Sequence, residues 1–292
     1  MLEQFIINAI IVGSIYALIA LGFTIIYRTV KFFHFAHGVV YTAGAYFAYT
    51  FFTFIHLPFA LCFLLAMLLA AVLGIAIDKL VYSPLRIFKA SNFVLLLASF
   101  GAFIFLQNLI GLIFGNQILV LNLGPVEEGY KIFSAVITPV QILILVVSIL
   151  LMILLWIFIQ KTKIGKAMRA VADDSLAASV VGINPDKIIL ASFALGSALA
   201  GAAGVLISLE TNLTPVMGFS AILKGIIASV IGGVGSIPGA LAGGFILGFA
   251  ENLGIAFLPS EWKDFISFAI LIVFLLVRPY GIFGTKTDKE TV

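Results

Sequence analysis

Long apolar runs separated by short polar intervals divide the chain into segments of membrane length. A transmembrane helix needs about 20 mostly apolar residues. Residues 32–77 contain no Asp, Glu, Lys or Arg, a length sufficient for two such helices, and His56-Leu57-Pro58 supplies the break between them. On this reasoning the pattern predicts regular spans at residues 5–27, 35–54, 58–77, 93–114, 138–159, 188–209 and 262–277.

The region from residue 219 to residue 257 departs from this simple pattern. Lys224 interrupts its front, and the glycine-rich residues 232–239 break its middle. We expect a short segment at 219–231, a broken or re-entrant helix, followed by a span at 238–257. Irregular backbone at this depth is tolerated only where protein or a water-filled cavity covers it. The predicted fold is therefore an all-α polytopic membrane protein, a bundle of about eight or nine transmembrane helices.

One long polar interval, residues 161–187, stands apart from the apolar pattern. Its first half carries the densest basic cluster of the chain, which places it on the cytoplasmic face by the positive-inside bias. We expect two short helices there, with Gly165 opening the first and Asp173 and Asp174 capping the second at 175–181. Gly182 would end the second helix, and Asn184-Pro185 would turn the chain toward the next span. Such a structured interval suggests a docking surface, and a solvated loop that only sets topology is the alternative.

The remaining basic residues agree with this orientation. All Lys and Arg residues except Lys131, Lys224 and Lys263 fall in intervals on the same side as 161–187 or in the tail 278–292. Residues 124–129, on the opposite side, carry an acid excess. The N-terminus is predicted outside and the C-terminus in the cytoplasm. We expect one membrane domain, residues 1–292, without a soluble domain.

Composition narrows the class further. Hydrophobic residues make up 63% and charged residues 10% of the 292 positions, whereas a soluble domain has roughly 25% charged residues. The net charge of +3 is too small to indicate nucleic-acid binding. The single cysteine, Cys62, lies in an apolar run, which excludes a disulfide framework and a cysteine metal site.

Small residues recur one helical turn apart in two segments. This spacing lets helix backbones approach closely, which drives association in lipid. We expect these residues to pack the bundle, and the same faces could line a pathway or a subunit interface. The predicted packing residues are Gly196, Ala200, Gly201, Gly204, Gly239 and Gly243.

Polar side chains inside apolar spans are candidates for a translocation path, because they are costly in hydrocarbon unless they face the bundle or water. His37, Gln107 and Asn108 are the candidates that we favour. For His34 and His37, structural hydrogen bonding near the inner interface is the competing and preferred interpretation. No third ligand accompanies the two histidines, so no metal site is expected. Glu251 is interpreted as a residue that extends toward the outer interface.

Catalytic motifs are missing from the chain. Gly165-Lys166 is followed by Ala167 and lacks the upstream glycine of a phosphate-binding loop. No His-Glu-x-x-His helix, Ser/His/Asp arrangement or intramembrane carboxylate pair is evident. We therefore expect no enzyme and no cofactor in this chain, and any ATP hydrolysis must come from a partner.

Three blocks resemble one known family, the permeases of branched-chain amino acid ABC importers, of the LivH type. The first is Gly13-Ser-Ile-Tyr-Ala-Leu-Ile-Ala-Leu-Gly-Phe-Thr24 with Phe35-Ala-His-Gly38 and Gly44-Ala-Tyr46. The second runs from Gly165-Lys-Ala-Met-Arg-Ala170 through Gly182-Ile-Asn184 to Ala200-Gly-Ala-Ala-Gly204. The third joins residues 225–240 to Arg278-Pro-Tyr-Gly-Ile-Phe-Gly284. The resemblance covers essentially the whole chain.

The resemblance implies a subunit of a larger machine in the cytoplasmic (inner) membrane of a bacterium or archaeon. Expected partners are a second homologous permease, two cytoplasmic ATPase subunits holding ATP and Mg²⁺, an extracytoplasmic binding protein, membrane lipid, and Leu, Ile or Val as substrate. Residues 161–187 would be the loop that couples to the ATPase. The loop residues carried over are Gly165, Met168, Arg169, Ala170, Asp173, Ala177 and Gly182.

Two alternatives remain open from the sequence. The same machine could carry urea, short amides or other amino acids. An ion-coupled secondary transporter acting alone is the alternative from another class, and it should show ionisable residues near the middle of spans and a repeat of opposite topology. In this sequence the charges fall at predicted span ends, which favours the permease.

Overall fold

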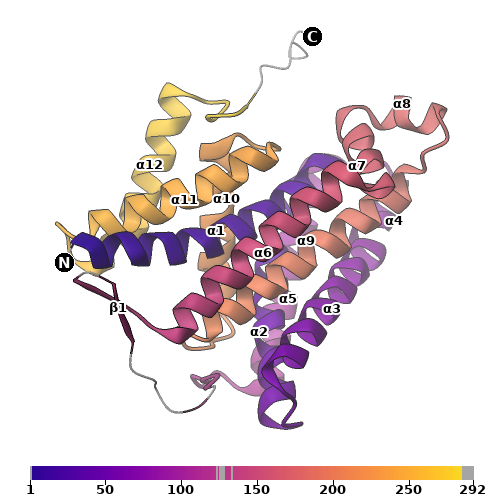
Figure 1. The fold of residues 1–292 in the computed structure, drawn as a ribbon. Coiled ribbons are helices and arrows are strands. Elements are labelled where there is room, and N and C mark those ends of the chain that lie inside the picture. The colour runs from indigo at the N-terminus through magenta and orange to yellow at the C-terminus, as the bar shows by residue number, and fades with distance from the viewer. Residues whose placement is uncertain (1, 123, 125–128, 133, 285–292) are drawn as a thin grey trace.

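The protein consists almost entirely of helices, as the computed structural model in Figure 1 shows. The structure describes residues 2–122, 124, 129–132 and 134–284. Residues 125–128 of the predicted acidic loop and 285–292 of the predicted tail lie outside the described residues. The elements are α1 (Leu2–Val30), α2 (His37–Thr53), α3 (Phe59–Ile77), the π-helical η1 (Asp78–Tyr82), α4 (Ser83–Ile87), α5 (Asn92–Phe114), β1 (Tyr130–Ile132), β2 (Ala135–Ile137), α6 (Pro139–Lys161), α7 (Lys163–Asp173), α8 (Ser175–Val180), α9 (Pro185–Ser208), α10 (Met217–Gly232), α11 (Ile237–Gly254), the 3₁₀ turn η2 (Ser260–Trp262) and α12 (Lys263–Val277).

Helix α1 forms the centre of the bundle. It packs against α9, α10 and α11 along most of its length, and 83% of its most apolar window is buried. Its sequence alternates small residues with Ile and Leu, so that other helices can approach it on several sides. The buried centre thus contains the first helix of the chain and helices that come much later.

Glycines hold the central helices at very short distances. A Cβ added to Gly248 of α11 would lie 2.5 Å from the Cα of Gly13 in α1, and one added to Gly44 of α2 would lie 2.4 Å from the Cα of Gly201 in α9. Real Cβ atoms do not approach backbone so closely, so any larger residue would push these helices apart. Backbone-to-backbone packing of this kind replaces the hydrophobic driving force that helices lack in lipid.

Helices α10 and α11 form a bent pair with an angle of 117° between them. The turn contains Gly233 at φ 109° and Gly235 at φ 87°, backbone conformations that other residues rarely adopt. The sequence prediction of a broken helix at this place is confirmed. The observed helices begin and end within a few residues of the predicted 219–231 and 238–257.

The number of spans differs from the prediction. Five helices are long and apolar enough to cross a membrane, or six when the bent pair is taken as one span, among the described residues. Helices α2 and α12, with 17 and 15 residues, fall below that length. The prediction of eight or nine spans is therefore not confirmed, although a helix lies at every predicted position.

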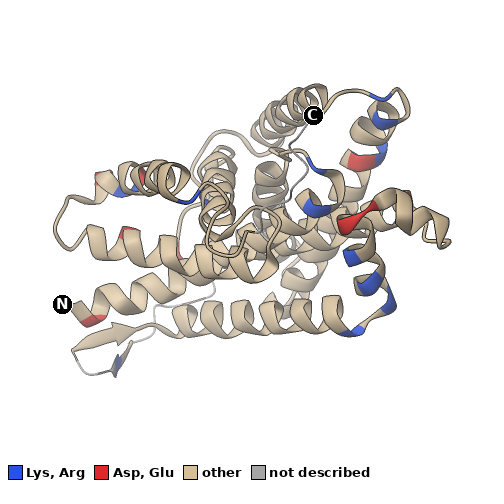
Figure 2. Cartoon of the chain, turned by 90° about the horizontal axis from the view of Figure 1, so that it is seen from above, with Lys and Arg blue, Asp and Glu red and all other residues tan. Residues whose placement is uncertain are grey.

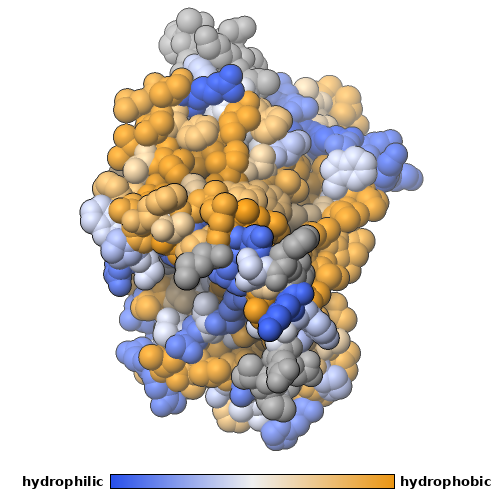
Figure 3. Space-filling model, turned by 60° about the vertical axis from the view of Figure 1, so that its left-hand side comes forward, coloured by the Kyte–Doolittle hydropathy of each residue, from blue (hydrophilic) through white to orange (hydrophobic). Residues whose placement is uncertain are grey.

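Helices α3, α5 and α6 form the outer part of the bundle. Only 28% of the membrane-length window containing α3, 17% of that of α5 and 28% of that of α6 is buried. Figure 3, which brings forward the side of the molecule with α12 and the N-terminus, shows large apolar areas on that side too, where a soluble protein would show polar residues. These surfaces suit lipid or apolar protein partners.

The helix that begins as α3 continues beyond its predicted end at residue 77. It passes through the π-helical turn η1 into α4, so the whole run extends over Phe59–Ile87. Asp78 is almost completely buried, and Arg86 binds it through two hydrogen bonds of 2.6 and 3.2 Å. This bidentate pair neutralises the carboxylate, which explains why an acidic residue does not end the helix.

A small hairpin corrects the all-α expectation. Strands β1 and β2 pair antiparallel in the connection between α5 and α6. The Gln4 side chain of α1 donates to the Val136 carbonyl at 3.0 Å and accepts from the Val136 N–H at 2.8 Å. Glu3 accepts hydrogen bonds from Ser134. The hairpin is thus attached to the N-terminal end of α1.

Candidate functional site

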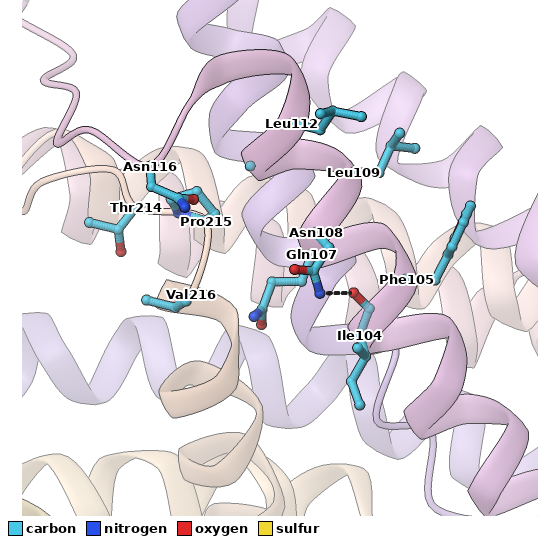
Figure 4. Close-up of a pocket in the computed structure, with 11 residues that line it drawn as sticks. Ile104, Phe105, Gln107, Asn108, Leu109, Leu112, Asn116, Thr214, Pro215 and Val216 are labelled. Carbon is cyan, nitrogen blue, oxygen red and sulfur yellow. Dashed lines mark hydrogen bonds between the residues drawn. The ribbon is translucent and has the colours of Figure 1, made fainter.

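A cavity of about 850 Å³ opens between α5 and the segment that leads from α9 into α10. Figure 4 shows two walls, with residues of α5 on one side and residues 214–216 on the other. The ring of Phe219 in α10 lies 6.1 Å from that of Phe103 in α5, so the two helices that carry or follow the walls also contact each other. The lining residues are Ile104, Phe105, Gln107, Asn108, Leu109, Gly111, Leu112, Asn116, Thr214, Pro215 and Val216.

The cavity lining combines apolar side chains with uncharged polar groups. Gln107 points from α5 toward the wall that carries Val216 (Figure 4). Asn108 is exposed, and its Nδ2 donates to the Ile104 carbonyl at 2.8 Å, which leaves the side-chain oxygen free to accept. Amides in an apolar cavity can bind the polar end of a small molecule while the hydrocarbon walls contact its aliphatic part.

The structure separates His37 from the other two candidate path residues. His37 is fully buried at the start of α2, and a Cβ added to Gly22 of α1 would lie 3.0 Å from its ring. His34 is also buried, with its Nδ1 2.8 Å from the Tyr82 hydroxyl. Thus Gln107 and Asn108 lie together at the cavity, and His37 lies inside the helix packing.

The predicted packing residues lie at helix crossings. Gly196 faces the Gly22 carbonyl of α1, and Gly201 and Gly204 face α3 and α2. Ala200 is fully buried in the same helix. Gly239 and Gly243 face Gly232 and Ala228, which brings the two arms of the bent pair together.

The polar interval 161–187 forms a projection of two short helices, at the upper right of Figure 1. Helix α7 begins at Lys163, two residues before the predicted Gly165, because the Thr162 side chain caps it by accepting from Gly165 N–H at 3.0 Å. Asp174 alone caps α8, accepting from the N–H groups of Leu176 and Ala177. Asp173 is the last residue of α7 instead, so the prediction that both aspartates cap the second helix is wrong for Asp173.

The end of the projection follows the expected pattern more closely. Gly182 adopts a φ of 85° just beyond α8, as its predicted role at a helix end requires. Asn184 caps α9 through a 3.2 Å hydrogen bond from Lys187 N–H, and Pro185 is the first residue of that helix. The predicted turn at Asn184-Pro185 is therefore the start of the next helix.

The two helices of the projection differ in exposure. In α7, Gly165 and Met168 are buried against the bundle, and Arg169 donates a hydrogen bond to the Ile159 carbonyl of α6. Ala170 is half-buried and Ala177 is exposed. In and just after α8, Leu176, Val180 and Val181 are 76%, 83% and 74% exposed. Apolar side chains this exposed on a polar projection are typical of an interaction surface.

The sequence analysis missed a buried charged cluster. Lys224 and Glu251, only 6% and 1% exposed, form an ion pair of 2.5 Å between α10 and α11. The interpretation of Glu251 as a residue reaching the outer interface is therefore wrong, and so is the statement that charges fall only at span ends. Lys224 inside an apolar segment was the available signal. A buried lysine requires a buried acceptor.

No group of three or more His, Cys, Asp or Glu residues that could hold a metal ion occurs in the part of the chain that the structure describes. Membrane-length helices, a cavity lined by uncharged residues and an exposed polar projection define a polytopic membrane protein. The comparisons with known proteins agree. A family model described as the permease component of branched-chain amino acid transport systems matches residues 5–275, and the chain belongs to this family.

Individual relatives are similar over nearly their whole length. The chain is 40% identical to the high-affinity branched-chain amino acid permease LivH of Escherichia coli strain K12, and 39% identical to LivH of Salmonella typhimurium; each alignment covers 98% of this chain and 96% of the relative. It is 37% identical to BraD of Pseudomonas aeruginosa, over 99% of this chain and 97% of that protein. No solved structure matches the chain.

Proposed function

We propose that this protein is the membrane-spanning permease subunit of an ATP-driven importer that translocates Leu, Ile or Val. The family membership carries this proposal, because relatives similar over nearly the full length are named as branched-chain amino acid permeases. The chain supplies no ATPase site of its own in this proposal. Two cytoplasmic ATPase subunits with ATP and Mg²⁺, a second homologous permease and an extracytoplasmic binding protein complete the machine.

The projection α7–α8 is the proposed coupling surface for the ATPase. Its apolar tip at Leu176, Val180 and Val181 is accessible. Met168 and Arg169 attach α7 to the bundle, so a force on the tip reaches α6 directly. Gly165, Ala170, Asp173, Ala177 and Gly182 shape the same projection.

The cavity beside α5 is the proposed part of the translocation path. Asn108 is exposed on a membrane-length helix, where an amide facing hydrocarbon would be costly. Water or a partner permease must therefore cover it. Gln107 belongs to the same cavity, whereas the buried His37 is assigned to helix packing. The apolar walls suit an aliphatic side chain, and the amides suit the polar end of an amino acid.

The proposed orientation places the N-terminus outside and the C-terminus in the cytoplasm. Most Lys and Arg residues gather at the end of the molecule that carries the projection, whereas the N-terminus lies at the opposite end (Figure 2). This distribution agrees with the positive-inside bias. Lipid would cover the apolar surfaces of α3 and α6.

Affinity capture from native membranes tests the coupling surface. The double change Leu176→Glu, Val180→Glu introduces charge on the apolar tip. Neither original side chain makes hydrogen bonds, so the change removes none. We expect the variant to lose the ATPase subunits and leucine uptake while its amount in the membrane stays normal. Val136→Glu, on the hairpin at the other end, is the matched control and should keep both.

The alternative of an ion-coupled transporter acting alone has one feature in its favour, the buried Lys224–Glu251 pair. The same capture experiment decides between the two. Recovery of the wild-type protein alone, with uptake independent of any ATPase, would overturn the importer proposal.

A further inference from the structure

The buried cluster around Lys224 joins four helices. The Lys224 Nζ lies 2.5 Å from Glu251 Oε1 of α11, 2.8 Å from Asp264 Oδ1 and 2.7 Å from Ser267 Oγ, both of α12. The Tyr16 hydroxyl of α1 donates to Glu251 Oε2 at 2.8 Å. All three donors of the ammonium group therefore have acceptors.

The cluster is well suited to fix the position of α10 relative to α11 and α12. Burying an ion pair is weak support for stability in itself, because desolvation offsets the attraction. Several hydrogen bonds from one ammonium group do, however, restrict its geometry, and here their acceptors lie on two different helices, α11 and α12. Ser267 is the only buried residue of the described helix α12, and it belongs to this cluster.

Helix α10 connects this cluster with the cavity. The helix begins at Met217, immediately after the cavity wall formed by Thr214, Pro215 and Val216. Lys224 lies about 12 Å from Val216 along the axis of helix α10, at a rise of roughly 1.5 Å per residue. The rings of Phe219 and Phe103 bring α10 into contact with α5, the helix that forms the opposite wall.

The far end of α10 is also attached to the segment that follows α12. The N–H groups of Ile282 and Phe283 donate to the carbonyls of Ile231 and Gly232 at 3.0 and 2.9 Å. These carbonyls end the helix and would otherwise lack partners. Helix α10 is thus bound to α12 at its middle by side chains and to the segment beyond α12 at its end by backbone.

We propose that Lys224 is a positioning residue for the translocation cavity. By binding acceptors on α11 and α12, it fixes α10 and thereby the wall at residues 214–216 relative to α5. The cavity's role in transport rests on the proposed function, whereas the position of the wall does not. Substrate does not contact Lys224, because the ammonium group is enclosed by the cluster.

Site-directed labelling in native membranes tests this inference. Replacing the single cysteine by Cys62→Ala gives a background in which Val216→Cys reports one wall and Leu112→Cys reports the other. Val216 and Leu112 are 59% and 82% exposed, and both line the cavity. The measurement is the rate of reaction of each cysteine with a water-soluble maleimide, with and without the double change Lys224→Met, Glu251→Gln.

The double change removes both buried charges together, so neither remains unpaired. We expect the labelling rate at position 216 to rise several-fold while the rate at position 112 stays constant. A change that merely loosened the whole protein would raise both rates. An unchanged ratio of the two rates, in protein present at the normal amount, overturns the inference.

A milder variant keeps the inference testable if the double change prevents insertion. Asp264→Ala with Ser267→Ala removes the two acceptors on α12 and retains the Lys224–Glu251 pair. We expect a smaller rise at position 216 in the same direction, and no change would again overturn the inference. Leucine uptake by Asn108→Leu is measured in parallel. Full uptake there would refute the cavity's role in transport while leaving the labelling result valid.

Discussion

The glycine-packed centre and the outer helix α5 place the same residue types in contrasting surroundings. In the centre, a Cβ on Gly204 would lie 2.0 Å from the Tyr41 carbonyl, whereas a Cβ on Gly101 of α5 would meet nothing within 4 Å. In the centre Lys224 and Glu251 are paired and buried, whereas Asn108 at the cavity is exposed. The same residue types therefore have two roles in a membrane protein. In the centre they allow close helix packing, and on α5 they leave a surface that a partner or a substrate can contact.

The largest expected effect comes from leaving one buried charge without its partner. Lys224→Met removes the positive charge beside Glu251, which is 1% exposed, and breaking a buried pair in this way destabilises a protein by about 3–5 kcal/mol. We expect the variant to lose its folded chromatographic peak at a much lower temperature after detergent extraction. Adding Glu251→Gln to it should restore most of the stability, and a double variant as unstable as the single one would contradict this account of the cluster.

Glycine substitutions compare the two regions directly. Gly204→Ala forces α2 and α9 apart, and overpacking costs about 1–3 kcal/mol. Gly101→Ala meets no atom, and alanine in a helix interior is favoured over glycine by about 0.5–1 kcal/mol. The thermal stabilities of the two variants should therefore change in opposite directions. Equal losses at both positions would show that α5 is packed as tightly as the centre.

A smaller effect is expected at the cavity, and on transport instead of stability. Asn108→Leu removes an acceptor worth about 1 kcal/mol, which corresponds to roughly a fivefold increase in the apparent KM for leucine uptake. Gln117→Leu, an exposed amide that does not line the cavity, is the control. Uptake kinetics in whole cells at matched protein amounts provide the measurement, and equal effects of the two changes would count against the cavity.

The smallest effect is expected where the projection meets the centre. Arg28 of α1 lies 3.8 Å from Asp173 of α7, whose side chain is 78% exposed. Exposed ion pairs contribute about 0.2–1 kcal/mol and are weakened by salt. Asp173→Asn should leave thermal stability and uptake nearly unchanged. A large loss of uptake at normal stability would assign this pair a part in transmitting motion from the projection.

Most helices could be predicted because lipid imposes a strong and simple pattern on the chain. Uncharged stretches such as residues 32–77 and the glycine-rich break after α10 determine where helices begin and end. The projection was also predicted in outline, because its caps are local signals. Helix ends were not always predicted. The run from Phe59 continues to Ile87 because Arg86 neutralises Asp78, and apolar periodicity does not reveal this contact between residues eight positions apart.

The candidate site was harder to predict because it depends on which helices meet. Gln107 and His37 are both polar residues in apolar runs, yet one lines a cavity and the other is enclosed by α1 and α2. Likewise, Lys224 and Glu251 belong to segments whose mutual angle of 117° is set by glycine conformations in the turn. Nothing in either residue's immediate neighbourhood specifies the pairing.

The hydrogen bonds from Ile282 and Phe283 to the end of α10 have a consequence for biosynthesis. A ribosome produces α10 well before these residues, and α12 lies between them. The last carbonyls of α10 therefore cannot accept the hydrogen bonds from Ile282 and Phe283 until α12 has also been synthesised and inserted. Until then these two carbonyls must accept hydrogen bonds from water or from another group. Maturation of the bent pair, unlike that of α1 or α3, is expected to be completed late.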